Sequence, residues 1–213
     1  MQLSFAESYN RLVHLQPVKL SGQRIYLEPL SETHLADLAQ VGLDAEIWRF
    51  MLYGKMQTDG DLHRWILEML ERQKKGKDLP FTVIQCSNGK AIGCTRYMNV
   101  EAMHRSLEIG GTWYGRLYQG SGVNAEAKFL LLKYAFEYLG CIRVQLKTDA
   151  RNLQSQRAIE RLGAVKEGVL RNHMILPDGT IRDSIYYSIL DEEWPQVKQK
   201  LEQRLEKLQV DPG

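Results

Sequence analysis

The sequence has few of the residues that mark metal-binding or disulfide-rich proteins. Only 3 of its 213 residues are cysteines, and Cys86, Cys94 and Cys141 lack the close spacing of a zinc site. We interpret them as buried thiols in strands or at helix ends. Free buried thiols are typical of a reducing compartment, so we expect a cytoplasmic protein. The 5 histidines are scattered, and we therefore expect no metal.

Long apolar runs are also missing, as is a large charge of one sign. No run approaches the roughly 20 residues that span a bilayer, and the N-terminus lacks the apolar stretch of a secretion signal. The net charge of +2 is too small to indicate nucleic-acid binding by itself. The chain has 44% hydrophobic and 25% charged residues, which is ordinary for a globular domain. We expect a compact soluble enzyme with neither a membrane nor a nucleic-acid partner.

Periodicity and turn residues predict a chain in which blocks of strands and helices alternate. Asn88-Gly89 is a strong hairpin signal between two of the strands. The order of the blocks predicts an α+β fold with a mixed sheet, not a doubly wound parallel sheet. In chain order we expect a strand pair within 18–30, helices that begin at Ser31, near Ile47 and at Thr58, a meander of strands over 81–86, 91–98 and 106–114, a long helix, a strand over 142–149, a helix over 152–162 ended by Gly163, and strands over 164–170 and 182–190.

Three parts of the chain are distinguished by composition. Residues 1–17 read as a lead segment, 18–191 as the main domain, and 192–213 as a C-terminal amphipathic helix and tail. The apolar stripe of that helix predicts packing within the chain, and a contact between two copies in a homodimer is the alternative. The stripe consists of Trp194, Val197, Leu201, Leu205 and Leu208.

The most informative pattern lies within residues 106–139, where a strand leads through a glycine-bearing loop directly into a helix. The first turn of a helix has unpaired N–H groups and a positive dipole end, so it attracts anions. Gly120 and Gly122 remove side chains that would keep a phosphate from the backbone. The loop is therefore a candidate phosphate cradle. The helix is predicted from the spacing of Ala127, Leu130, Leu131, Tyr134, Ala135 and Tyr138.

Several known loops could account for this cradle. A Walker loop needs a lysine after the second glycine, and Ser121 stands there instead. The dinucleotide fingerprint is matched by Gly120, Gly122 and Ala125, with Asp149 at the end of the next strand, but further parallel units do not follow. A third pattern, Gln119-x-x-Gly122-x-Asn124, is that of the pyrophosphate loop of acyl-CoA-dependent N-acyltransferases, with Asn124 in place of a small residue. It also remains possible that the glycines only form the turn between strand and helix and that the loop binds no phosphate.

A connected series of segments after the loop resembles the GNAT superfamily, in its branch of ribosomal-protein alanine and serine acetyltransferases. The series is more specific than the glycine loop, and it weakens toward the N-terminus, where 25–30 and 46–50 still fit. It comprises Trp113-Tyr114, Ala125-Glu126-Ala127, Arg143–Leu146, Asn152–Ile159, Leu162-Gly163-Ala164, Glu167–Asn172, Pro177-Asp178-Gly179 and Arg182–Leu190.

The resemblance implies an enzyme that uses acetyl-CoA as co-substrate to acetylate an amine. In the GNAT fold two neighbouring parallel strands splay apart and receive the pantetheine arm; here they would be 107–114 and 143–149. Gly110-Gly111 within the first strand also predicts a bulge or a close backbone approach. The residues that the resemblance implies for CoA binding are Thr112, Trp113, Tyr114, Gln119, Gly120, Ser121, Gly122, Val123, Asn124, Ala125, Asn152, Ser155 and Arg157.

Two side chains are candidates for the chemistry. Glu108 lies on the splaying strand and is our candidate general base, although a solvent-facing glutamate fits the pattern equally well. Ser155 is the candidate proton donor to the departing thiolate, as in some relatives, although a first-turn serine is common. Asn152 is expected to cap the same helix.

The acceptor is left open by the sequence. Trp48, Arg49 and Phe50 are expected to wall its side together with the 171–182 hairpin. The possible acceptors include a protein N-terminus, a polyamine, an amino acid and an antibiotic. Two other readings also remain, a dinucleotide-binding protein and a non-catalytic acyl-CoA-binding protein of the same fold.

Overall fold

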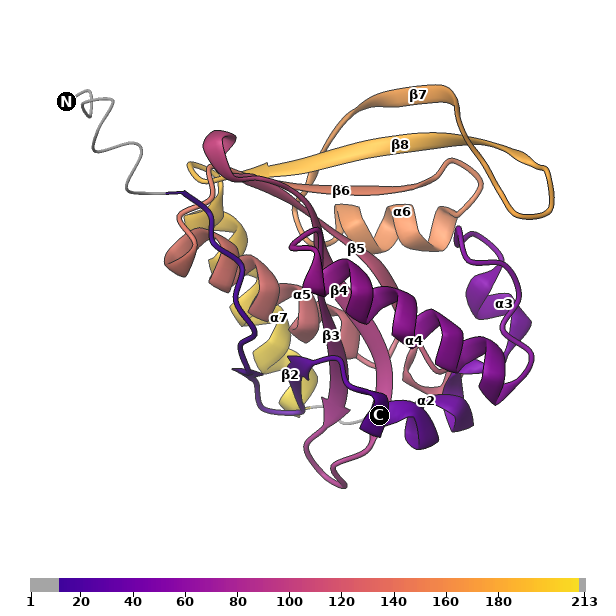
Figure 1. Cartoon of the computed structure of the whole chain (residues 1–213). Coiled ribbons are helices and arrows are strands. Elements are labelled where there is room, and N and C mark those ends of the chain that lie inside the picture. The colour runs from indigo at the N-terminus through magenta and orange to yellow at the C-terminus, as the bar shows by residue number, and fades with distance from the viewer. Residues whose placement is uncertain (1–11, 211–213) are drawn as a thin grey trace.

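The computed structural model describes residues 12–210, which form an α+β fold around one eight-stranded sheet (Figure 1). The strand order is β1-β2-β3-β4-β5-β6-β8-β7. Among these neighbours only β5 and β6 run parallel, which confirms the mixed and mostly antiparallel sheet expected from the sequence. The strands are β1 (Leu20–Ser21), β2 (Ile25–Pro29), β3 (Leu79–Gln85), β4 (Ala91–Glu101), β5 (Ser106–Tyr114), β6 (Arg143–Asp149), β7 (Val165–Ile175) and β8 (Ile181–Leu190).

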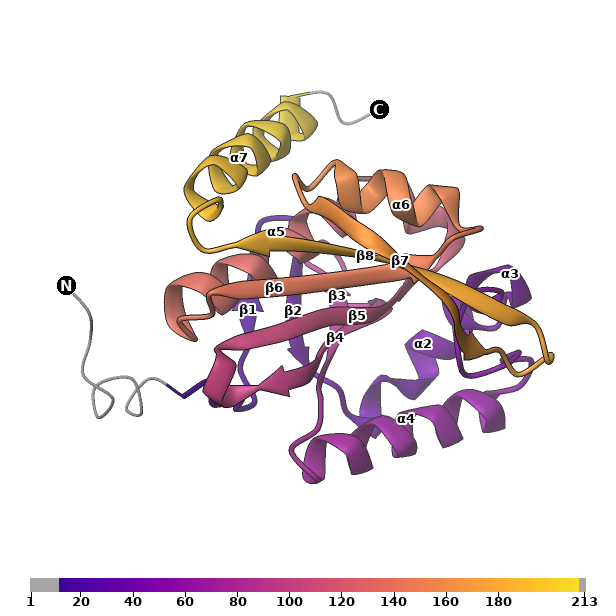
Figure 2. The ribbon, with the colours of Figure 1, turned by 90° about the horizontal axis from the view of Figure 1, so that it is seen from above.

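Helices cover both faces of the sheet (Figure 2). On one face α2 and α4 bury a cluster that includes Leu38, Trp65 and Met69, and on the other α5, α6 and α7 bury a larger one that includes Leu131, Ile159 and Leu201. The helices are α2 (Leu35–Gly42), α3 (Ala45–Trp48), α4 (Asp59–Lys74), α5 (Val123–Lys133), α6 (Leu153–Glu160) and α7 (Trp194–Val210), with short 3-10 turns η1 (Glu32–His34), η2 (Ala102–His104) and η3 (Arg116–Tyr118) and a π-helical turn η4 (Tyr134–Tyr138).

The two parallel strands separate soon after they meet. Pairing between β5 and β6 runs from Ser106↔Arg143 to Glu108↔Gln145 and ends there. Beyond it, β5 stays paired with β4 and β6 with β8, so the strands diverge (Figure 1). We call this region, from Glu108 and Gln145 onward, the splay. The facing backbone edges of the splay have no strand partner within residues 12–210, as the resemblance implied.

A β-bulge interrupts β5 inside the splay. The β4 partner of Gly110 is Arg96 and that of Trp113 is Cys94, so Gly111 and Thr112 together lie opposite Thr95. Gly111 has φ +57, the left-handed region that glycine adopts without a steric cost. This is the geometry of a bulge with glycine in its first position, and it confirms the irregularity predicted at Gly110-Gly111.

The helix after the cradle differs from its prediction in shape and burial. The regular helix ends at Lys133 and widens into a π turn, in which Leu139 N–H donates to Tyr134 O. Of the predicted apolar stripe, Ala127, Leu131 and Ala135 are buried, Leu130 and Tyr134 are half-buried and Tyr138 is exposed. Val123 and Leu132, outside that stripe, are buried as well. Because α5 lies between the sheet and α7, its buried surface exceeds one stripe, and it includes the charged Glu126 and Lys128.

Smaller differences between prediction and structure concern the ends of two strands and one cysteine. β3 begins at Leu79, two residues before the predicted start at 81, and so includes Pro80. β7 extends five residues past the predicted end at 170, to Ile175. Cys86 is exposed at the end of β3, so the interpretation of all three cysteines as buried thiols was wrong for it. Thr58 caps α4 as expected, since its hydroxyl accepts from Asp61 N–H.

The ends of the described chain pack against the larger core. Trp194, Val197 and Leu201 of α7 are buried there, as expected of packing within the chain. Of the lead segment, residues 1–11 lie outside the described residues, and Val13 is buried. Between residues 12 and 210 no helix is both long and apolar enough to cross a membrane.

Candidate active site

The N-terminus of α5 is shaped to leave backbone donors available. Gly122 occupies the N-cap position with φ +91, and no side chain caps the helix. The first intrahelical hydrogen bond runs from Glu126 N–H to Gly122 O, so the N–H groups of residues 123–125 have no helical acceptor. By contrast, side chains cap α3, α4 and α6. Unpaired N–H groups at the positive end of a helix suit a phosphate.

The side chains of the cradle turn away from this opening. Gln119 donates to Tyr114 O at 3.2 Å and Ser121 to Tyr118 O at 2.7 Å. Tyr114 donates its hydroxyl proton to Asn124 Oδ1 at 3.3 Å, so the asparagine that departs from the acyl-CoA loop pattern points toward the core. The cradle thus presents backbone. Ala125 and Val123 are buried beneath it, and Gly120 has open space where a Cβ would lie.

Two residues distant in sequence complete the cradle, and sequence reasoning missed both. Arg24, from the turn before β2, donates to Ser121 O at 3.2 Å. Leu208 of α7 lies where a Cβ on Gly122 would be 2.8 Å from its Cδ1. These contacts join the first and last described elements of the fold to the loop, and no local pattern in the sequence signals them.

The start of α6 faces the same loop. Asn152 Oδ1 accepts from Ser155 N–H at 3.0 Å, so Asn152 is the N-cap. Gln154 lies 3.5 Å from Gln119 Oε1 across the two loops. Ser155 is half-buried and Arg157 is exposed. Ser155 has its hydroxyl free of the capping bond, because its backbone N–H makes that bond.

The last residues of β5 can offer backbone alone to the splay. Trp113 is buried in the core beneath α4, and Tyr114 is buried on the opposite face. The Thr112 hydroxyl is hydrogen-bonded to Thr95 at 2.9 Å and to Lys128. All three were expected to contact CoA, and their side chains are engaged elsewhere.

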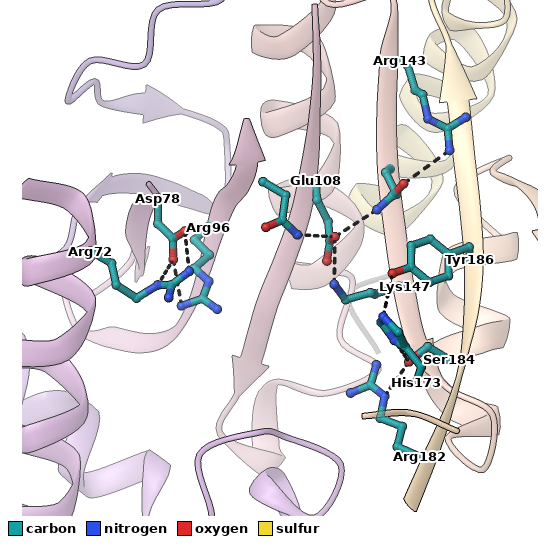
Figure 3. A network of polar contacts seen from close by, with 12 residues as sticks. Arg72, Asp78, Arg96, Glu108, Arg143, Lys147, His173, Arg182, Ser184 and Tyr186 are labelled. Atoms are coloured by element: carbon teal, nitrogen blue, oxygen red, sulfur yellow. Dashed lines mark hydrogen bonds and ion pairs between the residues drawn. The ribbon is translucent and has the colours of Figure 1, made fainter. Parts of the chain in front are cut away.

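Glu108 is the last β5 residue paired with β6, and its side chain is 2% exposed. Its Oε2 accepts from Asn99 at 2.9 Å, Gln145 at 3.1 Å and the Lys147 ammonium at 3.1 Å (Figure 3). The interpretation as a solvent-facing glutamate is therefore wrong. Instead, Glu108 is a buried carboxylate, held by three donors at the mouth of the splay.

A second polar group extends this site across β8 and β7 (Figure 3). Ser184 Oγ accepts from Arg182 Nε at 3.0 Å and lies 3.0 Å from His173 Nδ1. His173 Nε2 in turn lies 3.4 Å from the Tyr186 hydroxyl, and the Lys147 ammonium lies over the Tyr186 ring, 5.8 Å from its centre. Alternate residues of β6 and β8 thus present polar side chains on one face of the sheet.

Sequence reasoning missed Lys147, His173, Arg182, Ser184 and Tyr186. The available signal was the alternation of polar and apolar residues in 143–149 and 182–190, which puts the polar ones on one face. That face could not be assigned to the site before the strand order was known.

Burial sets the charge of this group. It lowers the pKa of His173, and the nearby Lys147 and Arg182 cations lower it further, so His173 is neutral at pH 7. Burial raises the pKa of the Tyr186 phenol. A neutral imidazole beside a neutral phenol can pass a proton in either direction.

The expected acceptor wall is formed only in part. Trp48 is 2% exposed and packs on Trp65 and Trp113 in the core, so it walls nothing. Phe50 does meet the hairpin: its carbonyl accepts from Arg182 at 3.3 Å. A hollow beside the hairpin is lined by Val169, Leu170, Arg171, Asn172, His173 and Asp183.

The dinucleotide-binding alternative loses support from the geometry. Asp149, the candidate ribose ligand of a dinucleotide site, accepts three hydrogen bonds from Arg151 and is 1% exposed. Within residues 12–210 no group of three or more His, Cys, Asp or Glu is arranged to hold a metal ion.

Comparisons with known proteins agree with this arrangement. The family model described as "Acetyltransferase (GNAT) domain" matches residues 24–165. The Bacillus subtilis protein named "Putative ribosomal N-acetyltransferase YdaF" is 33% identical over 79% of this chain and 90% of its own length. The ribosomal-protein-serine acetyltransferase of Escherichia coli is 22% identical over 84% and 99%. A solved structure from T. thermophilus, titled a "putative acetyltransferase", has a TM-score of 0.82 and 39% identity over 90% of this chain and 99% of that one.

Proposed function

Because the chain belongs to the GNAT acetyltransferase family, and is thus an acyl-CoA-dependent enzyme, we propose that it transfers an acetyl group from acetyl-CoA to a primary amine. The observation that supports this most is the splay. Its two unpaired strand edges begin at the buried Glu108, and β5 leads on through the loop to the uncapped start of α5. A long, flexible co-substrate with a phosphate at one end and a thioester at the other fits such a path.

The chain offers matching groups for each part of acetyl-CoA. The backbone N–H groups of residues 120–125 would bind the pyrophosphate, with Arg24 beside them. The pantetheine amides would pair with the free backbone edges of β5, past Glu108, and of β6. Asn152, Ser155 and Arg157 would contact the coenzyme from α6. The coenzyme acts here as a co-substrate, and no metal is required for the transfer.

The bulge of β5 supplies the electrostatic part of the proposal. A bulge turns backbone N–H groups out of the ladder between strands, and near Gly111 such a group can donate to the thioester oxygen as it gains negative charge. The amine nitrogen bonds to the acetyl carbon, and the carbon–sulfur bond breaks. The departing thiolate takes a proton, for which the Ser155 hydroxyl is the proposed donor.

Glu108 is the proposed general base. An acceptor amine is mostly protonated at neutral pH, so a proton must leave before or during attack. Glu108 is buried at the mouth of the splay, where the acetyl group would lie, and its fixed orientation suits proton transfer directly or through one water. The neutral His173 and Tyr186 beside Lys147 offer a path for that proton to solvent.

The acceptor we favour is the N-terminus of a protein. Relatives named as ribosomal-protein acetyltransferases support a protein acceptor, and the polar face of β6 and β8 beside an open hollow could admit an extended peptide. A small amine is the alternative. A non-catalytic acyl-CoA-binding protein of the same fold would bind the coenzyme and consume none.

One experiment tests the function and separates these readings. Acetyl-CoA consumption is followed as thiol release with a panel of peptides that differ in their N-terminal residue, and with polyamines, amino acids and aminoglycosides. Turnover with peptides would support the proposal. Turnover with small amines alone would show that the acceptor is a small amine and not a protein N-terminus. Binding of acetyl-CoA without turnover of any amine would favour the non-catalytic reading.

A further inference from the structure

A lysine is buried in the core on the far side of the β5 bulge from α4. Lys128 extends from the second turn of α5 toward the sheet and is 5% exposed. Its ammonium nitrogen donates to Thr95 Oγ1 at 3.0 Å and to Thr112 Oγ1. The two hydroxyls are themselves 2.9 Å apart. The three side chains therefore form one closed hydrogen-bonded unit, which we call the bulge clamp.

The clamp has no acid in it. Among residues 12–210 the hydrogen-bond partners of the Lys128 ammonium are the two threonine hydroxyls, and burial alone lowers its pKa to about 7. The titratable neighbours on this face are Tyr97 of β4 and Tyr114 of β5, and burial raises the pKa of both phenols. Tyr97 donates to Leu131 O and Tyr114 to Asn124, so neither phenol pairs with the lysine.

The partners of Lys128 are the two positions that define the bulge. Thr112 is its second residue, and Thr95 is the single β4 residue opposite it. On the other face the Arg96 side chain covers Gly111, where a Cβ would lie 2.9 Å from Arg96 Nε. The bulge is thus held by the clamp on the α5 face of the sheet and by Arg96 on the opposite face. A six-residue stretch of α5 links the clamp to the N-cap Gly122, at the other end of the coenzyme path.

We propose that Lys128 is a positioning residue, which fixes Thr112 so that the backbone N–H groups of the bulge point at the acyl carbonyl. The inference rests on the proposed function, since it assigns a role within the same site. Lys128 itself lies in the core, with its ammonium on Thr95 and Thr112. It acts on the peptide planes on both sides of Gly111, whose orientation decides the strength of the hydrogen bond to the thioester oxygen.

A purely structural role accounts poorly for this lysine. A buried amine loses its hydration, and hydroxyl partners return only part of that loss. Without the lysine, the Thr95 and Thr112 hydroxyls, which lie 2.9 Å apart, still satisfy one another, so no buried polar group is left without a partner. Methionine at position 128 should therefore keep the fold and lose the clamp, which makes the two roles separable.

The direct readout is the carbonyl stretch of bound [1-13C]acetyl-CoA in the infrared. A hydrogen bond to the carbonyl oxygen lowers that frequency relative to free acetyl-CoA. We expect a clear downshift with the unchanged protein and loss of most of it with Lys128→Met, at an unchanged Kd for acetyl-CoA. Lys133→Met, the same substitution at the end of the same helix, is the matched control and should keep the full downshift.

Kinetics and a double-variant cycle complete the test, with the best acceptor from the amine panel. Lys128→Met should lower kcat about 10- to 100-fold at an unchanged KM for acetyl-CoA. Thr112→Val should do the same, and the double variant should be no worse than either, because the residues act as a unit. Thr95→Val, which leaves the Lys128–Thr112 bond, should cost less.

The outcomes separate this inference from the proposed function. A protein without substitutions that does not bind acetyl-CoA would remove the proposed function itself. A protein that binds acetyl-CoA and acetylates an amine with no downshift would keep the function and overturn the bulge donor, and this inference with it. A full downshift and full kcat in Lys128→Met would overturn the inference alone, as would additive losses in the double variant. If Lys128→Met loses its fold, Thr112→Val carries the same infrared test, and retention of its downshift would also overturn the inference.

Discussion

The Lys147 ammonium donates to the Glu108 carboxylate at 3.1 Å, and the side chains of the two residues are only 11% and 2% exposed. Glu108 pairs with Gln145 at the last rung between β5 and β6, and Lys147 lies two residues further along β6. The ion pair thus marks the point where the splay opens. Removal of one partner of a buried pair leaves an uncompensated charge. A test of Glu108 as a base must therefore separate chemistry from charge balance.

Glu108→Gln is expected to lower kcat by about 10²–10⁴-fold with little change in the Kd for acetyl-CoA. The loss should shrink as pH rises, because a larger fraction of the acceptor amine is then already neutral. Steady-state kinetics from pH 6 to 9 or so measure both effects. Glu108→Gln with Lys147→Met removes the pair as a whole. Recovery of kcat in that double variant would show that charge imbalance, not a lost base, slowed the enzyme.

The cradle can be tested at a glycine whose replacement disturbs nothing else. Gly120 has φ +78, and a Cβ added there would meet no atom within 4 Å; Gly89 in the β3–β4 turn has φ +70 with the same open surroundings. Asparagine tolerates this backbone region. Gly120→Asn should therefore raise the Kd for acetyl-CoA about tenfold or more at an unchanged Tm, because its side chain enters the phosphate position. Gly89→Asn should leave the Kd and the Tm unchanged.

Titration calorimetry with acetyl-CoA and with 3′-dephospho-CoA measures these affinities. Equal binding by Gly120→Asn and the unchanged protein would show that Gly120 only forms the turn. Gly122 is unsuitable for this purpose, since any side chain there also meets Leu208 and would disturb the packing of α7.

Ser155→Ala is expected to lower kcat by at most about tenfold, with weak pH dependence, because a hydroxyl only assists departure of the thiolate. The substitution spares the helix cap, which uses the Ser155 N–H and the Asn152 side chain. Asn152→Ala is the matched comparison, and it should lower the free energy of unfolding by about 1 kcal/mol. A kcat loss in Ser155→Ala as large as that of Glu108→Gln would contradict the assisting role.

The sequence predicted the parts of this molecule that local patterns encode. Strand β5 and the start of α5 follow from a strand pattern, positive-φ glycines and helical spacing, and Gly110-Gly111 predicted the bulge. The family resemblance added the splay between β5 and β6. These features are backbone conformations, and each depends on a few residues that are neighbours in the sequence.

Contacts between distant segments lay beyond the same reasoning. Glu108 was equally compatible with solvent exposure until the strand order put Asn99, Gln145 and Lys147 around it. Lys128 falls outside the predicted apolar stripe of α5, and it is buried because its side chain reaches Thr95 of β4 and Thr112 of β5. Helical periodicity reports one buried face and cannot anticipate a helix covered on two sides.

The bulge clamp also predicts how stability depends on pH. The folded-state pKa of Lys128 is about 7, far below the ordinary lysine pKa near 10.4 of the unfolded chain. Between these values the unfolded state binds the additional proton, so the free energy of unfolding rises with pH, by about 1.4 kcal/mol per pH unit at most from this residue. Below about pH 7 Lys128 is protonated in the folded state as well, so it no longer makes the free energy of unfolding depend on pH.

Urea unfolding of the protein without substitutions and of Lys128→Met from about pH 6.5 to 9.5 isolates this effect as a difference, because the contributions of the other titratable groups cancel. The gap in stability should narrow as pH rises, with Lys128→Met the more stable near pH 7, and parallel curves would show that Lys128 is charged in the folded state.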